Sequence, residues 1–437
     1  MWAQRGPPGG TDQRRGTHCR PVRRSDGLLH WRDDTRRRWR PAMTQRRDVL
    51  LAGFGACSAA GPDVEAFWRA LQRAPEAPSP NAIVPRSTDG RTWRHGHCLP
   101  ASASHVHADF DSLIADVALQ ALDDARRRGH ALDTLHTGLV LGTAAGDSRR
   151  AERHRLEDAV APYATSHPYR AIDTLPHVLP IQVSGPAFVA ANACSAGLHA
   201  LVHAVDIIRA GMADAMIVIG ADLLSHVTQS GFQRMTALDP QGCMPFDVRR
   251  LGTVLGEGAA ALVLVADSEA AAHAGSAGRI RGIGVSCDAF HPTAPEPGGR
   301  DISRALREAL RDANVGPDGI DVIVPHGTGT PPNDRIEGNI LAAVLGPSVV
   351  MPPVLSVKAH IGHTAGASGL FSLLAAALAL AHRKVPAGYC ERPDPATRIR
   401  LPSRETPLRA RRPLRALINA CGFGGNNVSL VLQEGTP

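Results

Sequence analysis

Cys194 stands among the small residues of the stretch ANACSAG, which one residue separates from the helical pattern HALVHAVDIIRAG. A thiol at the N-terminus of a helix is expected to have a lowered pKa, because the unpaired N–H groups and the helix dipole favour the thiolate. The thiolate is the form that a cysteine nucleophile requires. An ordinary buried cysteine is the alternative for any isolated thiol, and it fits Cys57, Cys287 and Cys421 better.

Two later stretches contain histidines that could assist such a nucleophile. The first, HGTGTPPND, places His326 at the end of a predicted strand, and Thr328 and Thr330 add hydroxyl groups beside it. His326 could donate a hydrogen bond to a carbonyl oxygen or an oxyanion, although an ordinary loop with a surface histidine is the alternative. Asp334 and Glu337 follow at the spacing of a helix start, where an acidic side chain can simply cap the helix.

The second stretch, SVKAHIGHTAGASG, combines Lys358 with His360 and His363. Lysine is rare in this chain, because only Lys358 and Lys384 are lysines among the 48 basic residues. A metal site built from these two histidines and His326 is disfavoured, since no carboxylate or thiolate ligand stands at a recognised spacing. His363 fits a general acid, a general base or an oxyanion donor better.

The elements that must position these residues alternate in type along the chain. From Met43 onward, short apolar runs alternate with helical patterns, which indicates an α/β protein. In the first half we expect strands at 48–55, 137–146, 215–222 and 256–267, and helices at 64–74, 111–129 and 199–211. In the second half we expect strands at 279–290, 320–330 and 353–363, two more within 416–433, and helices at 303–313, 335–346 and 367–383. The last two strands enclose the turn GFGG, in which the N–H of Phe423 could point at a developing oxyanion.

The two halves are similar in sequence as well as in the order of their elements. ADVALQALDDA followed by GLVLGTAAGD resembles SRALREALRDA followed by DVIVPHGTGT. This repetition favours a duplicated α/β core whose strands are buried on both faces. We therefore expect a first half at 43–267 that carries Cys194 and a second half at 268–437 that carries the histidine pair.

The order of these motifs is more specific than any one of them. The four stretches around the nucleophile, the histidines and GFGG, together with PFDVRRLGTVLGEGAAALVL (245–264) and DAFHPTAP (288–295), resemble the β-ketoacyl-[acyl-carrier-protein] synthases. These are the elongating condensing enzymes of fatty-acid and polyketide synthesis. The resemblance runs from Met43 to the C-terminus and implies a thiolase fold, in which two similar α/β halves form α-β-α-β-α layers. It also implies a homodimer, or a heterodimer with a related subunit.

The resemblance implies a role for each motif. Cys194 matches the nucleophile that takes the acyl group from acyl-carrier protein, and its N–H and that of Phe423 match the oxyanion hole. His326 and His363 match the pair that drives decarboxylation of malonyl-carrier protein, and Lys358 matches the lysine that sets their electrostatic state. The remaining matches are Asp334 and Glu337 in the acidic network near the lysine, and Thr293, Thr328 and Thr330 at positions that contact the phosphopantetheine arm. No cofactor is implied, because the substrates are carried on the phosphopantetheine of acyl-carrier protein.

Two features depart from the family pattern. Ser372 stands nine residues past His363, where the bacterial enzymes usually carry a glutamate that pairs with the lysine. Lys358 would then rely on Asp334, Glu337 or water. The stretch PIQVSGPAFVAANAC also lacks the usual GLRGP letters, and both differences favour a specialised branch of the family.

Three other functions share parts of this pattern. A thiolase uses a second cysteine as base near the C-terminus, and Cys421 does precede GFGG, but the paired histidines argue against that chemistry. An initiating synthase that uses an acyl-CoA starter has an asparagine where this chain has His363. A non-catalytic chain-length factor usually lacks the cysteine that is present here at position 194.

The net charge of +7 lies outside the predicted catalytic body. Residues 1–42 contain eleven arginines and four aspartates, which leaves 37 basic and 37 acidic groups in residues 43–437. This tail has no periodic apolar face and is expected to be disordered. It lacks the apolar stretch of a secretory signal, and we expect translation to start at Met43. A nucleic-acid partner is disfavoured, and no apolar run is long enough to predict a membrane helix.

The cysteines and the charges also bear on location and partners. The eight cysteines form no CxxC pair, which disfavours a zinc site or a disulfide framework and favours reduced thiols in the cytoplasm.

Acyl-carrier proteins are acidic, so a formally neutral body must present a local basic patch to bind one. The candidates are Arg249 with Arg250, and Arg383 with Lys384.

Overall fold

The strands of the protein assemble into one large sheet at the centre of the fold. The computed structural model describes residues 47–80, 95–99, 109–156, 167–239, 241–268, 271 and 273–436. The predictions for residues 1–42 therefore lie outside the described residues. The nine strands follow the order β5-β4-β6-β7-β1-β8-β13-β12-β9. Their bounds are β1 Val49–Ser58, β4 Thr137–Gly142, β5 Val183–Ala190, β6 Ala215–Asp222, β7 Gly258–Ala266, β8 Gly278–Cys287, β9 Val322–Val324, β12 Arg415–Gly422 and β13 Asn426–Glu434.

The sheet consists of two halves with the same pairing pattern. In the first half, β1 pairs antiparallel with β7, β7 antiparallel with β6, and β4 parallel with both β6 and β5. In the second half, β8 pairs antiparallel with β13, β13 antiparallel with β12, and β12 parallel with β9. A parallel bridge between Ile323 and Val354 takes the place that β5 holds in the first half. The halves meet where three residues of β1 pair with β8.

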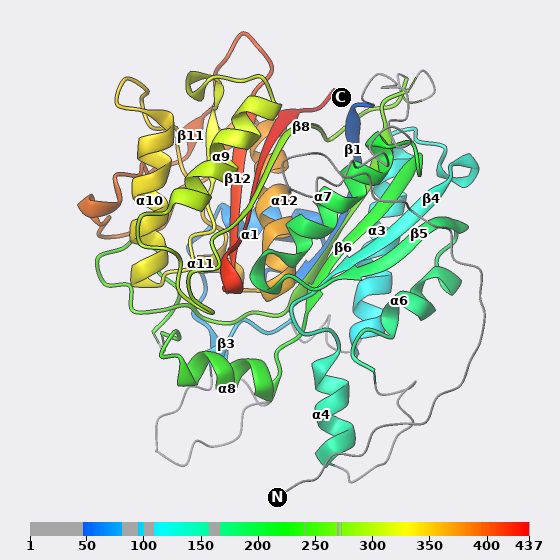
Figure 1. Cartoon of the computed structure of the whole chain (residues 1–437), viewed down its shortest axis with the longest axis horizontal. Coiled ribbons are helices and arrows are strands. Elements are labelled where there is room, and N and C mark those ends of the chain that lie inside the picture. Colours follow the sequence, from blue (N-terminus) through cyan, green and yellow to red (C-terminus); the bar gives the residue numbers. More distant parts are fainter. Residues whose placement is uncertain are drawn as a thin grey trace, which may run out of the picture. The chain divides into compact units, whose positions relative to one another are not determined.

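Helices cover both faces of the sheet, and two of them lie between its halves. The helices α7 (Ala196–Arg209) and α12 (Ser368–Ala381) share one apolar cluster with the inner faces of both halves (Figure 1). The helix α3 (Phe110–Arg127) packs on the outer face of the first half, and α9 (Arg300–Asp312) and α10 (Pro331–Leu345) pack on that of the second. The α-β-α-β-α layering expected of a thiolase fold is therefore confirmed.

Alternation along the strands decides which layer each side chain joins. In β6, Met216 and Val218 belong to the inner cluster, whereas Ile217 and Ile219 belong to the cluster around α3. Successive side chains of a strand point to opposite faces, so a strand covered on both sides needs apolar residues at nearly every position. This explains why β6 reads as a continuous apolar run and why the sequence predicted it at 215–222 without error.

The two central helices begin in the same unusual way. A short 3-10 turn, Ala193–Ser195, precedes α7, and another, Ala365–Ala367, precedes α12. The first residue of each turn has a positive φ, 49° at Ala193 and 44° at Ala365, a conformation that is strained for a residue with a Cβ. These strained turns fix the direction in which each helix leaves the sheet.

The sequence prediction failed at two segments near the site. We expected a strand at 353–363, but Pro353, Val354 and His363 form isolated bridges only, and Lys358–Ile361 forms a short helix, α11. The strand β5 was not predicted, because Gly185 and Pro186 lie inside it. Proline is tolerated at the edge of a sheet, which is where β5 lies. Among the described residues, no helix is long and apolar enough to cross a membrane.

Candidate active site

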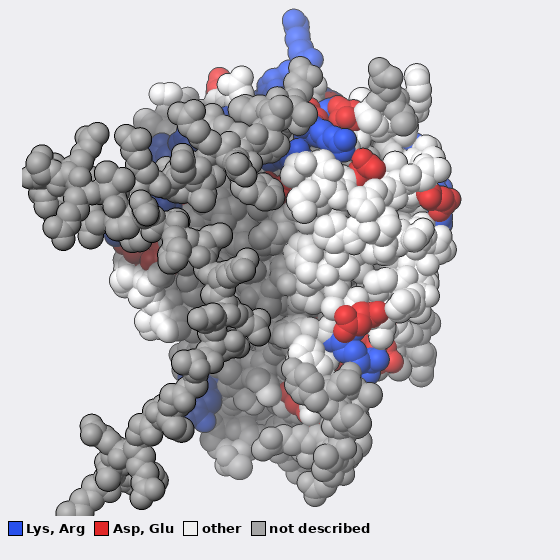
Figure 2. Space-filling view, turned by 45° about the vertical axis from the view of Figure 1, so that its right-hand side comes forward, with Lys and Arg blue, Asp and Glu red and all other residues white. Residues whose placement is uncertain are grey.

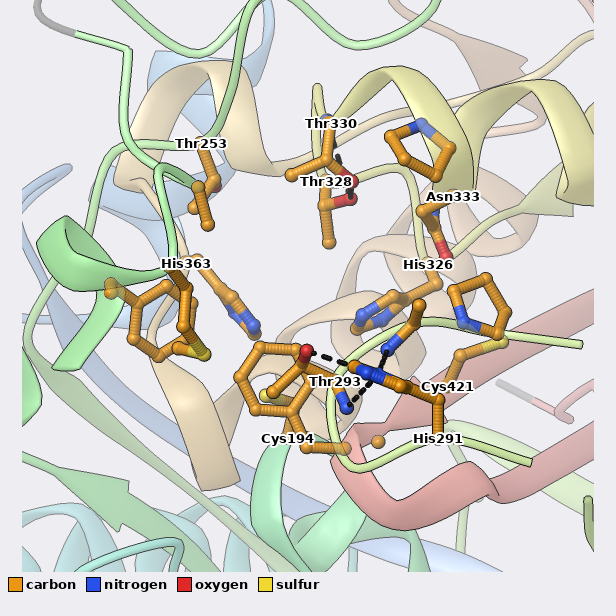
Figure 3. A pocket seen from close by; sticks show the side chains of 18 of the residues that line it. Cys194, Thr253, His291, Thr293, His326, Thr328, Thr330, Asn333, His363 and Cys421 are labelled. Carbon is orange, nitrogen blue, oxygen red and sulfur yellow. Dashed lines mark hydrogen bonds between the residues drawn. The ribbon is translucent and has the colours of Figure 1, made fainter. Parts of the chain in front are cut away.

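One pocket, with a cavity volume of about 500 Å³, collects residues from both halves of the fold. Its lining includes the predicted nucleophile, both predicted histidines, the phenylalanine of GFGG and the three predicted arm-binding threonines: Cys194, His326, His363, Phe423, Thr293, Thr328 and Thr330 (Figure 3). The sequence stretches that supply them are separated by up to 229 positions. The sheet halves bring them together because α7 and α12 start side by side, where a Cβ on Gly197 would lie 2.5 Å from the carbonyl oxygen of Gly366.

Cys194 lies in the turn before α7 and is 4% exposed. Burial raises the pKa of its thiol to about 11, although the N–H of Phe423 and the charge of Lys358 act in the opposite direction. The expectation of a lowered pKa is therefore wrong for this structure, because desolvation outweighs the favourable N–H groups. The contact with the Phe423 N–H nevertheless places that group at the sulfur, as the oxyanion-hole prediction requires.

The two histidines face each other across the pocket. The ring centroids of His326 and His363 are 5.5 Å apart, and the rings are nearly perpendicular. Burial and the nearby charge of Lys358 hold the pKa of both imidazoles well below 6.5, so both are neutral at physiological pH. Nδ1 of His363 lies 2.9 Å from Oγ of Ser368, a contact that fixes the orientation of the ring.

Lys358 is 1% exposed and lies under the loop that carries His326. Its ammonium donates a hydrogen bond to the backbone carbonyl of His326. Burial lowers its pKa, and Glu337 is the largest influence that raises it. With Ser372 in α12 instead of a glutamate, no carboxylate lies within ion-pair distance of Lys358 among the described residues. In place of the usual glutamate, the hydrogen-bond partner of Lys358 is therefore the backbone carbonyl of His326. Glu337 acts on the lysine through its charge.

Glu337 and Asp334 hold the histidine loop through its backbone. Glu337 accepts hydrogen bonds from the N–H groups of His326, at 2.7 Å, and Gly327, at 2.8 Å. Asp334 accepts hydrogen bonds from the N–H of Thr328, at 3.0 Å, and from that of Phe246, at 2.8 Å. Burial raises the pKa of Asp334 to about 6 and also raises that of Glu337. Both carboxylates are thus buried supports of the loop rather than exposed caps of α10.

The three threonines lie on two different segments at the pocket. The hydroxyl groups of Thr328 and Thr330 are 2.8 Å apart on the loop after β9. Thr293 follows β8, and its N–H donates a hydrogen bond to Nδ1 of His291 at 3.1 Å. Hydroxyl groups on both sides of the opening can bind the amides of an extended polar chain.

Sequence reasoning missed several polar residues that support or line the site. Asn419 donates a hydrogen bond from Nδ2 to Glu337 at 2.7 Å, and Ser429 donates one to the Oδ1 of Asn419 at 2.9 Å. Ser368 orients His363, and Asn333 and Thr253 line the cavity. A polar residue inside an apolar strand, such as Asn419 in β12, was the one available signal, because a buried amide needs partners.

Two further observations near the site concern His360 and metal ligands. His360 contacts the carbonyl of Arg73 through Nε2 at 3.1 Å and does not line the cavity. No cluster of three potential metal ligands occurs among the residues that the structure describes.

The basic residues suggested for carrier-protein binding are engaged in ion pairs. Arg250 is 7% exposed and pairs with Asp394 at 2.8 Å, so it cannot form part of a docking surface. The other three candidates pair with acidic neighbours: Arg249 with Asp247 and Glu391, Arg383 with Glu434, and Lys384 with Glu405.

Comparisons with known proteins identify the family to which the chain is similar. The family model described as Beta-ketoacyl synthase, N-terminal domain, matches residues 46–270, and the model of the C-terminal domain matches residues 277–389. Nodulation protein E of Rhizobium meliloti (strain 1021) is 30% identical over 408 residues, which cover 89% of this chain and 99% of that protein. The 3-oxoacyl-[acyl-carrier-protein] synthase 2 of a Synechocystis species is 29% identical over 426 residues, which cover 90% and 99%.

A solved structure described as the ishigamide ketosynthase/chain length factor is similar over nearly its whole length. The TM-score is 0.79 at 29% identity, and the match covers 89% of this chain and 99% of that one. The similarity supports the same layered fold over both halves.

Proposed function

The chain belongs to the β-ketoacyl synthase family, and we propose that its pocket joins an acyl group held on Cys194 to a two-carbon unit from malonyl-carrier protein. The observation that carries this proposal is the meeting of one buried thiol and two neutral imidazoles in a single cavity. The product would be a fatty-acid or polyketide chain lengthened by two carbons.

In the first half-reaction, the sulfur of Cys194 attacks the thioester carbonyl of the acyl-carrier protein. The thiol is protonated at rest, because its pKa is about 11, so its proton passes to the sulfur of the departing phosphopantetheine as the new C–S bond forms. The N–H groups of Cys194 and Phe423 stabilise the oxyanion of the tetrahedral intermediate.

In the second half-reaction, the malonyl unit loses CO₂, and the electron pair of the broken C–C bond remains as a thioester enolate. His326 and His363 donate hydrogen bonds to the enolate oxygen, which neutral imidazoles can do through one N–H each. The enolate carbon then attacks the acyl carbonyl on Cys194, and the C–S bond breaks to release the thiolate. Burial keeps the imidazoles neutral with a further contribution from the charge of Lys358, which also donates a hydrogen bond to the carbonyl of His326.

The proposed partner is an acyl-carrier protein, and no resident cofactor is needed. The related synthase 2 carries acyl-carrier protein in its name. Thr293, Thr328 and Thr330 would bind the phosphopantetheine arm at the pocket. Arg234 and Arg335 are exposed beside lining residues, and they replace the paired basic residues as candidates for docking an acidic carrier.

The edge strand β5 supports a dimer as part of the proposal. It pairs with β4 on one side, lies at the end of the sheet and contains no charged residue. Figure 2 turns the side of the molecule with β4 and β5 forward and shows a broad area there without charged side chains. We favour a second copy of this chain across that edge, and a related subunit is the other possibility, since the ishigamide structure pairs a ketosynthase with a chain length factor.

A non-catalytic role as a chain-length factor is the alternative function. The cysteine and both histidines in one pocket argue against it.

The location proposed for the protein is the cytoplasm. The cysteines that the structure describes are free, which fits the cytoplasmic location expected from the sequence.

Mass spectrometry after incubation with acyl-carrier protein tests the proposal directly. We expect one acyl adduct on Cys194 in the wild-type protein, condensation product after addition of malonyl-carrier protein, and neither in Cys194→Ala. Cys421→Ala is the matched control, because this second buried thiol also lines the pocket and should not be acylated. An adduct on Cys421, or full activity of Cys194→Ala, would contradict the proposed nucleophile.

A further inference from the structure

Thr253 is a buried polar residue of the pocket to which neither the sequence motifs nor the proposed mechanism assigns a role. It is 1% exposed and lines the cavity. Its backbone is fully engaged, because its N–H donates to the carbonyl of Ala237 at 2.8 Å and its carbonyl accepts from the N–H of Asp239 at 2.8 Å. The position of its side chain is therefore fixed by the fold.

The hydroxyl group of Thr253 is nearly unpartnered. Among the described residues, its closest polar contact is the sulfur of Cys243 at 3.8 Å. The thiol of Cys243 donates its own proton to the carbonyl of Thr328 at 3.3 Å. Sulfur is a weak acceptor, so the hydroxyl proton of Thr253 remains available to a ligand. A buried hydroxyl without a strong partner is costly unless something binds it.

The surroundings of Thr253 combine a polar wall of the pocket with an apolar cluster. Cys243 contacts both Thr253 and the backbone of Thr328, so the two threonines belong to one wall. In the view of Figure 3, Thr253 lies above His363, Thr328 and Thr330 lie above His326, and Cys194 lies below both rings. An apolar cluster adjoins this wall, because Phe232 stacks on Phe423 with ring centroids 5.3 Å apart in the cluster that contains Cys194, and Leu238, which forms a β-bridge with Thr253, belongs to the same cluster.

We propose that the hydroxyl group of Thr253 binds the free carboxylate of the malonyl unit and so positions it for decarboxylation. This inference rests on the proposed function. The carboxylate is the group that distinguishes the malonyl unit from the acyl group on Cys194, and the aromatic side chains of the apolar cluster offer it no donor. A hydroxyl suits the step better than a cation, because a neutral donor orients the carboxylate without stabilising its charge strongly against loss of CO₂.

The test compares Thr253→Val, which keeps the shape and removes the hydroxyl, with Thr253→Ser, which keeps the hydroxyl. We expect the KM for malonyl-carrier protein to rise roughly tenfold in Thr253→Val, as the loss of a hydrogen bond to a charged group implies, and to stay within about twofold in Thr253→Ser. Loading of Cys194 by acyl-carrier protein, followed by mass spectrometry, should proceed in both variants, because that thioester carries no carboxylate.

Thr137→Val is the matched control for the loss of a buried hydroxyl, since Thr137 is 2% exposed at the start of β4 and its hydroxyl donates to the carbonyl of Leu135. It should leave the KM unchanged. An unchanged KM in Thr253→Val, or an equal rise in Thr253→Ser, would overturn this inference while the wild-type protein still condenses. A wild-type protein that forms no acyl adduct would instead overturn the proposed function, and this inference with it. Thr253→Ala serves as the hydroxyl-free variant if Thr253→Val does not fold.

Discussion

At the scale of single residues, burial and a nearby ammonium together set the protonation of the two histidines. Lys358 and the two histidines are all buried, and the lysine charge lowers the pKa of both imidazoles in addition to the effect of desolvation. A neutral imidazole has one N–H to donate and carries no positive charge that would need a counterion. The lysine thus favours the form of His326 and His363 that stabilises an enolate by hydrogen bonding alone.

Replacement of the lysine should change how the site responds to pH. We expect Lys358→Met to raise the pKa of both histidines, because the cation that disfavours their protonation is gone. The acidic limb of the pH profile for malonyl decarboxylation should therefore move to higher pH. The rate near neutral pH should fall by roughly a hundredfold, since the carbonyl of His326 also loses its donor.

The chain offers its only other lysine as a control for this prediction. Lys384 pairs with Glu405 and hydrogen-bonds to Gln72, outside the cavity lining. Lys384→Met should leave the pH profile where it is. The electrostatic role assigned to Lys358 fails if Lys358→Met lowers the rate equally at every pH, because a purely structural defect would do that.

At the scale of elements, the turn before α7 determines where the nucleophile points. Ala193 holds a positive φ of 49° immediately before Cys194, a conformation that is strained for alanine and is an outlier for a β-branched residue. We expect Ala193→Val to destabilise the protein by about 1–3 kcal/mol and to slow acylation of Cys194, because a β-branched residue is strongly strained at this φ. Urea denaturation and the rate of adduct formation measure the two effects.

Glycine is the informative comparison at the same position. Ala193→Gly relieves the strained φ at the cost of a more flexible unfolded chain, so its stability should stay within about 1 kcal/mol of the wild-type value. Ala365→Val tests the equivalent turn before α12, where φ is 44°. If Ala193→Val is as stable and as reactive as Ala193→Gly, the turn does not set the position of Cys194.

These elements also show what could be predicted from the sequence. The prediction was close to the observed bounds for the strands β6 and β7 and the helix α9. Continuous apolar runs and a strong helical period are local signals, which the sequence shows directly. The strand predicted at 353–363 was wrong because pairing with β9 ends at Leu355, and Val357 and Ile361 are buried in the central apolar cluster rather than by strand pairing. Tertiary burial of this kind leaves no periodic signal.

The site itself was predictable as a set of residues but not as a chemical environment. The predicted nucleophile, the histidines and the threonines all line the cavity, since the order of the motifs specified them. The thiol pKa, the backbone partner of Lys358 and the contact between Ser368 and His363 depend on burial and distances, which no spacing in the chain encodes. Thr253 lay inside a recognised motif, and only the weakness of its one hydroxyl contact, to the sulfur of Cys243, distinguished it among the described residues.

At the scale of the whole molecule, the pocket exists only where the two halves meet. The first half supplies Cys194 through α7, and the second supplies the histidines and Phe423 through the loops after β9, α11 and β12. The duplicated pairing pattern of the sheet places the starts of α7 and α12 against each other, with glycines at the contact. Catalysis by this arrangement therefore depends on the packing of the halves as much as on the reacting groups.

The uncharged edge at β5 gives the last prediction, which concerns assembly. If a second copy pairs along this strand, a twofold axis through the middle of β5 brings its central residues close to their own counterparts in the other copy. We expect Ala187→Lys, at an exposed position of β5, to weaken the dimer by at least about a hundredfold, because two like charges would meet across the axis. Light scattering over a dilution series measures the change, and Val350→Lys, at a position that is 82% exposed and outside β5, should leave the dimer intact. A dimer unaffected by Ala187→Lys would move the interface elsewhere, whereas a wild-type chain that stays monomeric at micromolar concentration would favour a related subunit as the partner at this edge.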